Sequence, residues 1–123
     1  MITGVVNAYD EATIRLPIRT ADGQDQAVEV IVDTGFTGSL TLPPTVIASL
    51  GLPWRSRGLV ILANGSEEQC DMHAATVLWD GMPRNILVEA AQTDPLLGMA
   101  LLHGHDVRIQ VVEGGSMIIE ALP

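Results

Sequence analysis

Apolar and polar residues alternate with a period of two along much of the chain, a pattern that predicts β-strands. The clearest case is the segment 13–18, in which the aliphatic residues Ile14, Leu16 and Ile18 occupy every second position. Pro17 has no N–H to donate to a neighbour, so we expect this strand at the edge of a sheet. The expected strands are 2–8, 13–18, 28–32, 39–42, 59–62, 67–72, 76–79, 85–88, 107–111 and 117–120.

Pairs of residues typical of β-hairpin turns separate several of these strands. They are Asp22-Gly23, Asn64-Gly65 and Asp80-Gly81, of which the segment 63–66 favours a type I′ turn. Many short strands at roughly ten-residue spacing are typical of an all-β fold with a closed or sandwiched core.

Two short helices are expected among the strands. The first covers 45–50, with Pro44 in its first turn and Gly51 as its C-terminal cap. The second covers 99–103 and ends at Gly104.

The composition narrows the class of protein. With 123 residues, 47% of them hydrophobic, the chain is expected to form a single domain over 1–123. Its net charge of −9, with arginine as the only basic residue type, argues against binding to nucleic acid or to an anionic membrane. Because lysine is absent, Schiff-base chemistry is excluded.

Candidate chemistry begins where the apolar run 30–32 ends in Asp33, Thr34 and Gly35. A buried strand there delivers one carboxylate to a tight turn. Taken alone, this triplet is also typical of an ordinary strand-ending turn with a solvated aspartate. About sixty residues later, a second apolar run, 96–102, is interrupted only by Gly98.

The combination of these two segments resembles the retropepsin-like aspartic peptidases, the single-domain relatives of retroviral protease that include small bacterial members. The resemblance covers roughly 28–102. It implies a closed β-barrel or sandwich of the dimeric acid-protease fold and an aspartic endopeptidase, a hydrolase, acting on extended polypeptides.

Peptide hydrolysis by carboxylates needs two of them, one ionised to take a proton from water and one protonated to donate to the scissile carbonyl. The chain has one Asp-Thr-Gly, because Asp22-Gly23 and Asp80-Gly81 lack the threonine. We therefore expect a homodimer in which Asp33 of each subunit meets at the symmetry axis.

The resemblance also implies roles for the neighbouring residues. Asp33, Thr34 and Gly35 form the catalytic set. Thr34 would reach across the axis to the partner's loop, and Gly35 would bring its N–H close to the Asp33 carboxylate. The segment Leu96-Leu97-Gly98 would support this loop from beneath, as a structural element.

The hairpin tip at Ala63, Asn64 and Gly65 falls where the family carries a flap that covers the substrate, and Phe36 is a further substrate-binding candidate. A solvent-exposed hairpin tip without contacts is the alternative. Phe36 offers the Asp33 carboxylate no side-chain hydrogen bond, so we expect a less acidic optimum than in pepsin-like enzymes.

This sequence departs from the family at two places. Met99 and Ala100 stand where family members often carry Asp, Asn or Arg, and two strands rather than one follow the second helix. We therefore expect a dimer interface that differs from that of the retroviral enzymes.

The remaining candidate residues favour no other chemistry. His103 and His105 lack a third ligand, so we expect no metal site and no cofactor. Cys70 has no evident base partner. Trp54 and Trp79 are expected to be packing groups.

The N-terminus lacks a basic and apolar leader pattern, and no apolar run reaches membrane-spanning length, so we expect a cytoplasmic protein. Two other hypotheses stay open. One is a retropepsin-like module that dimerises or binds peptides without turnover. The other is a monomeric β-domain of unrelated topology.

Overall fold

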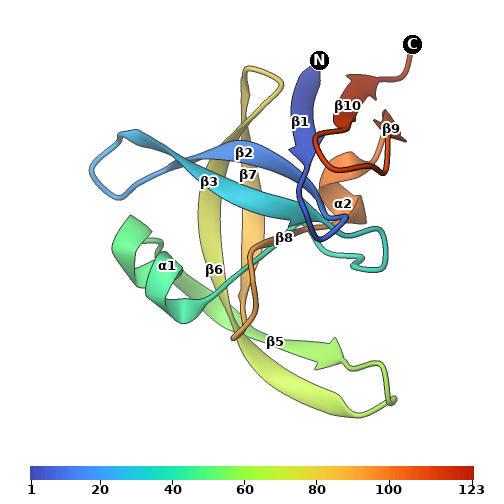
Figure 1. Cartoon of the computed structure of the whole chain (residues 1–123). Coiled ribbons are helices and arrows are strands. Elements are labelled where there is room, and N and C mark those ends of the chain that lie inside the picture. The colour runs from blue at the N-terminus through green and yellow to red at the C-terminus, as the bar shows by residue number, and fades with distance from the viewer.

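A computed structural model describes residues 1–123, with ten strands in one hydrogen-bonded sheet and two short helices (Figure 1). The elements are β1 (Ile2–Val6), β2 (Ala12–Arg19), β3 (Asp25–Val32), β4 (Leu40–Leu42), α1 (Pro44–Leu50), β5 (Trp54–Ile61), β6 (Glu67–Trp79), β7 (Met82–Ala90), β8 (Leu96–Leu97), α2 (Met99–Leu102), β9 (His105–Ile109) and β10 (Ser116–Ala121).

The sheet closes on itself through one additional contact. Its strand order is β5-β6-β7-β4-β8-β3-β2-β1-β10-β9, and β6 also pairs with β2. This pairing places Ile18 opposite Val77, and neither side chain is exposed to solvent. The result is a closed ring of six strands, from β2 through β3, β8, β4 and β7 to β6. The expected all-β fold with a closed core is confirmed.

We predicted from Pro17 that strand β2 lies at the edge of the sheet. That prediction is wrong, because β2 lies between β1 and β3. Pro17 lies opposite Ala27 of β3. At the Thr13–Ile31 pair the Ile31 N–H points away from β2, to the Pro95 carbonyl. Since this direction alternates along an antiparallel pair, the Pro17 nitrogen also points away from β3. On that side β1 has already ended, because it pairs only with the first two residues of β2.

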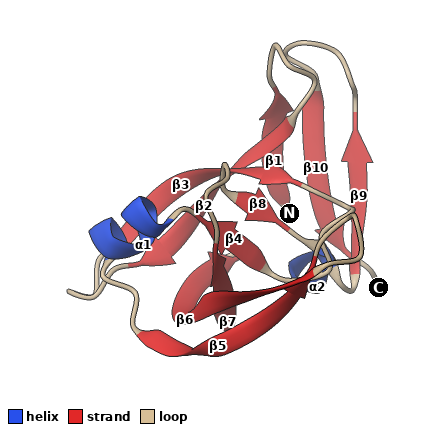
Figure 2. Cartoon of the chain, turned by 90° about the horizontal axis from the view of Figure 1, so that it is seen from below, coloured by secondary structure: helices blue, strands red, loops and turns tan.

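Strand β6 is a single element of 13 residues, where we expected the separate strands 67–72 and 76–79. Its first half pairs with β5, and the whole strand from Met72 onward pairs with β7. The β5–β6 hairpin therefore extends away from the ring while its return strand continues into the core (Figures 1 and 2).

The two Asx-Gly turns of the second half of the chain differ in type. Asp80 and Gly81 both have positive φ, 52° and 80°, as a type I′ turn requires. In the 63–66 turn only Gly65 has a positive φ, and Asn64 does not. The expectation of a type I′ turn is therefore wrong there. The Asn64 side chain accepts a hydrogen bond from the Ser66 N–H at 2.9 Å. This Asx turn stabilises a longer, three-residue loop.

The core contains 21 buried apolar residues, nearly all aliphatic, as the low aromatic content requires. Trp79 is buried and packs edge-on against His105, donating its Nε1–H to His105 Nε2 at 3.2 Å. Trp54, in contrast, is 61% exposed and bonds Asp71, so the prediction of a packing role is wrong for Trp54.

Helix α1 has the expected caps, with Pro44 in its first turn and Gly51 in the left-handed conformation at its C-terminus. Neither of the two helices has the length and apolar character needed to cross a membrane.

The pair that closes the ring gives a stability test. We expect Ile18→Ala to lower the free energy of unfolding by about 2–5 kcal/mol, because it leaves a cavity at the β2–β6 contact. Ile61→Ala, at a position 69% exposed, is the matched control, with an expected change within about 0.5 kcal/mol. Urea unfolding of both variants measures this, and equal losses would contradict the role of the closing contact.

Candidate active site

The Asp33 carboxylate stands at the end of a strand held on both sides. Asp33 directly follows β3, whose last two residues, Ile31 and Val32, pair in parallel with Leu96 and Leu97 of β8. The apolar run before the aspartate is thus fixed between β2 and β8. Asp33 itself is half-buried, and Thr34 and Gly35 are exposed.

One oxygen of this carboxylate is engaged within the loop. The Gly35 N–H donates to Asp33 Oδ1 at 2.9 Å, the contact that the resemblance implies. The Phe36 N–H donates to the Asp33 carbonyl at 3.2 Å and closes the turn. Asp33 forms no ion pair in this chain. No basic side chain therefore neutralises its carboxylate, which lines the cavity described below.

The second apolar run lies directly against this loop. The Asp33 N–H donates to the Leu97 carbonyl at 2.9 Å, and the Gly98 N–H donates to the Ser39 carbonyl at 3.0 Å. The Met99 N–H donates to the Phe36 carbonyl at 2.8 Å. These backbone bonds fix both ends and the middle of the 33–39 loop, which confirms the expected structural role of Leu97 and Gly98.

Gly98 is required here by the closeness of the packing. A Cβ atom at this position would lie 2.2 Å from the Gly38 carbonyl oxygen and 2.5 Å from Cδ2 of Phe36. Backbone atoms cannot move aside as a flexible side chain can. The half-buried Phe36 ring therefore packs against Gly38 and Gly98, inside the loop.

A cavity of about 510 Å³ opens beside Asp33 and Thr34. Its other walls come from the β1–β2 turn, the end of β3, the segment before β8 and the region around the end of β9. The lining residues are Asp10, Glu11, Ala12, Ile31, Val32, Asp33, Thr34, Thr93, Asp94, Leu96, Ile109 and Val111. Four carboxylates and no basic residue face this space, and several of its walls are aliphatic.

The other sequence-predicted residues are not part of this cavity. Ala63, Asn64 and Gly65 are exposed at the tip of the β5–β6 hairpin, and neither they nor Phe36 line the space beside Asp33. In this single chain the hairpin tip and the carboxylate are thus not brought together. Their predicted roles in substrate binding stay predictions.

Glu89 is a second acidic residue near the loop, and sequence reasoning missed it. It lies at the end of β7, opposite Thr41 of β4 and Met72 of β6. Its Oε1 atom would be 3.2 Å from a Cβ atom at Gly38. Burial raises the pKa of Glu89 above its usual value of 4.5. An acid directly after the apolar run 86–88 was the available signal.

The Cys70 thiol lies in the same region. Burial raises its pKa first, and the negative charges of Glu89 and Asp71 raise it further. A raised thiol pKa lowers the thiolate fraction, which disfavours Cys70 as a nucleophile.

Comparison with known proteins identifies the fold. EIAV protease, in a complex with the inhibitor HBY-793, has 19% sequence identity and a TM-score of 0.56 over 78% of this chain and 88% of its own. A retropepsin-like aspartic protease from Rickettsia conorii has 14% identity and a TM-score of 0.55 over 99% of this chain and 92% of its own. No family model and no curated protein matches the sequence. The chain thus has the retropepsin-like fold, as its resemblance implied.

The packing at Gly98 predicts a clear effect of one methyl group. We expect Gly98→Ala to destabilise the protein by about 1–3 kcal/mol or more, because the added carbon meets backbone atoms of the Asp33 loop. The measurement is thermal unfolding. Gly58→Ala is the control, since a Cβ atom there meets only side chains, the flexible Met72 at 3.0 Å and Cys70 Sγ at 3.9 Å. A larger loss in the control would contradict this account.

The raised pKa of Glu89 predicts a pH-dependent stability. The folded state holds the Glu89 proton more tightly than the unfolded state does, so stability falls as pH rises from 4.5 through the raised pKa. Glu89→Gln cannot ionise. We therefore expect it to melt at a higher temperature than wild type near neutral pH, and at the same temperature at about pH 3.5. A difference that is independent of pH would contradict this, and Glu29→Gln, at an exposed position, is the control.

Proposed function

We propose that this protein is a homodimeric aspartic endopeptidase that hydrolyses peptide bonds in extended polypeptides. The observation that carries the proposal is the position of Asp33, half-buried in the wall of a cavity, on a loop fixed by the β8–α2 segment. The retropepsin-like fold supports the same conclusion.

Two chains are needed because each supplies one Asp-Thr-Gly loop. Two carboxyl groups held within about 3 Å cannot both ionise, so they share one proton and titrate as a pair. The ionised member takes a proton from the attacking water, and the protonated member donates to the carbonyl oxygen. In this proposal the two members are Asp33 and its symmetry mate.

The neighbouring groups of the loop hold this carboxylate in place. The Gly35 N–H already donates to Asp33 Oδ1, which leaves the other oxygen for the water and the partner carboxyl group. Thr34 is exposed and so is free to hydrogen-bond the partner's loop. The hairpin tip at 63–65 would close over the substrate as a flap, excluding water and pairing with the extended backbone.

The charges around the cavity favour a particular substrate class. Asp10, Glu11 and Asp94 line it together with Asp33, without a basic residue. None of these four carboxylates forms an ion pair in this chain. We therefore propose that polypeptides with a Lys or Arg side chain next to the scissile bond are the preferred substrates.

The test is cleavage of a diverse peptide library between about pH 3 and about pH 8, a range that spans ordinary and raised carboxyl pKa values. Wild type is compared with Asp33→Asn, which keeps the shape of the side chain but cannot ionise. We expect cleavage by wild type, enriched at basic residues, and a loss of at least about 10³-fold in the variant.

Equal cleavage by wild type and Asp33→Asn would show that the activity does not come from this site and would overturn the proposal. No cleavage by either protein, with a stable dimer in sedimentation, would instead favour a binding module without turnover. Cleavage that depends on Asp33 but ignores basic residues would overturn only the substrate class.

A further inference from the structure

Arg84 is the only one of the six arginines whose side chain is not exposed. It lies on β7, on the same face as the buried Ile86 and Val88, because side chains alternate along a strand. Its neighbour on β6 is Val77, which is fully buried. Arg84 forms no ion pair. A charged group in a core-facing position is costly unless hydrogen bonds satisfy it, so the partners of this guanidinium matter.

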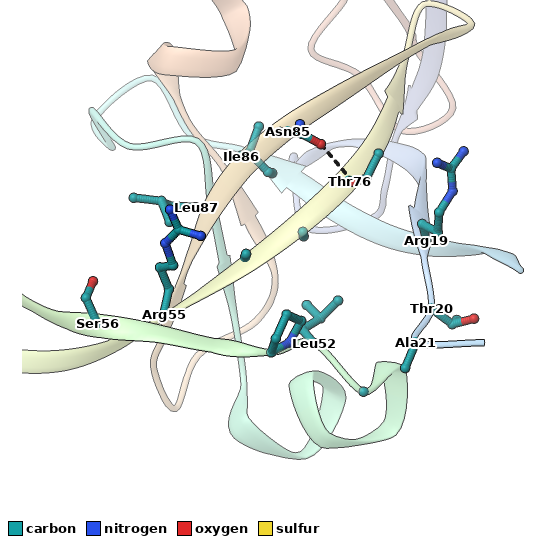
Figure 3. Close-up of a pocket in the computed structure, with 14 residues that line it drawn as sticks. Arg19, Thr20, Ala21, Leu52, Arg55, Ser56, Thr76, Asn85, Ile86 and Leu87 are labelled. Carbon is teal, nitrogen blue, oxygen red and sulfur yellow. Dashed lines mark hydrogen bonds between the residues drawn. The ribbon is translucent and has the colours of Figure 1, made fainter. Parts of the chain in front are cut away.

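Strand β7 is held firmly next to Arg84. Thr76 and Asn85 are the next opposed pair along β6 and β7, and the Thr76 hydroxyl donates to Asn85 Oδ1 at 2.8 Å, as Figure 3 shows. Cross-strand side-chain bonds of this kind stabilise the register of a sheet. The Arg84 side chain therefore starts from a fixed position.

The Arg84 guanidinium reaches helix α2. Its Nη2 donates to the Ala100 carbonyl at 3.2 Å, and its Nη1 donates to the Leu101 carbonyl at 3.4 Å. No backbone N–H after the helix donates to either of these carbonyls. A helix of four residues cannot satisfy its own last carbonyls, and its stability depends on contacts with the rest of the protein. Arg84 supplies such a contact.

The N–H groups of the same helix hold the Asp33 loop. The Met99 N–H donates to the Phe36 carbonyl at 2.8 Å, and the Ala100 N–H donates to the Gly38 carbonyl at 3.2 Å. Ala100 thus bonds the loop through its N–H and Arg84 through its carbonyl. A single residue of α2 separates the guanidinium from the loop that carries Asp33.

We propose that Arg84 is a positioning residue for the Asp33 carboxylate and acts through α2. The inference rests on the proposed peptidase function, since that function is what requires a fixed carboxylate. Arg84 does not line the cavity beside Asp33, so it has no direct part in the chemistry. A planar guanidinium with two N–H groups on two successive carbonyls fixes their orientation better than a single donor does.

The first test is amide hydrogen exchange, measured by NMR. Arg84→Met keeps an unbranched side chain and removes the donors. We expect the Met99 and Ala100 amides, which bond the loop, to exchange at least about tenfold faster in this variant, as expected for the loss of charged hydrogen bonds. The Ala74 amide, which donates to the Pro53 carbonyl at 3.0 Å, should stay within about twofold.

Two results of this test would overturn the proposal. Unchanged exchange at Met99 and Ala100 would show that Arg84 only packs against its neighbours. Equal acceleration at these amides and at Ala74 would show a general loss of stability rather than a loosened loop.

Two further variants separate hydrogen bonding from charge. Arg84→Lys keeps the charge and can satisfy one carbonyl, so we expect exchange rates between those of wild type and Arg84→Met. Arg15→Met is the matched control, because Arg15 is exposed and forms no ion pair. We expect its amides to exchange within about twofold of wild type. An acceleration in this control equal to that in Arg84→Met would show a general effect of net charge and overturn the role of Arg84.

The second test is peptide cleavage. We expect Arg84→Met to lower kcat about tenfold and to leave KM within about twofold, because a displaced carboxylate slows the reaction while the walls of the cavity stay in place. A raised KM with unchanged kcat, or a loss that matches the fall in the folded fraction, would overturn the positioning role. If Asp33→Asn cleaves as wild type does, the peptidase proposal fails by itself, and hydrogen exchange still decides whether Arg84 fixes the loop.

Discussion

The contact between the 33–39 loop and the residues around Gly98 is the constraint on which the site depends. Backbone hydrogen bonds from Asp33 to Leu97 and from Met99 to Phe36 hold the loop in one position. Gly98 permits this only because it has no side chain, with the Gly38 carbonyl oxygen filling the space that a Cβ atom would need. The carboxylate is thus positioned by atoms more than sixty residues away in sequence, and the aspartate triplet alone could not fix it.

The long strand β6 joins the β5–β6 hairpin to the closed ring of strands. One end, opposite β5, forms the outer arm of the hairpin, and the other closes the ring where Val77 meets Ile18 of β2. A cavity of about 790 Å³ lies between these ends, beside the bulge at Arg55 (Figure 3).

Local patterns predicted those features that depend on neighbouring residues. The strand before Asp33 and the cap of α1 at Gly51 follow from an apolar run and from a glycine at the end of a helical segment. The supporting role of Leu97 and Gly98 was instead implied by the family resemblance. The edge position of β2 was wrong because Pro17 is accommodated where β1 has ended. Such an arrangement depends on distant strands and leaves no local signal.

The features that the sequence could not predict arise where separate elements meet. Glu89 reaches the Asp33 loop through the pairing of β7 with β4, and a cavity of about 790 Å³ at the base of the β5–β6 hairpin is lined by residues of four strands and two loops. Neither has a spacing that marks it in the sequence.

The central claim is that two chains build one catalytic site from Asp33 of each. Its most direct test is peptidase activity per chain, measured over a dilution series alongside the dimer fraction from sedimentation. We predict that activity per chain falls with dilution in proportion to the dimer fraction and vanishes for the monomer. Activity per chain that stays constant after the protein has become monomeric would contradict the account.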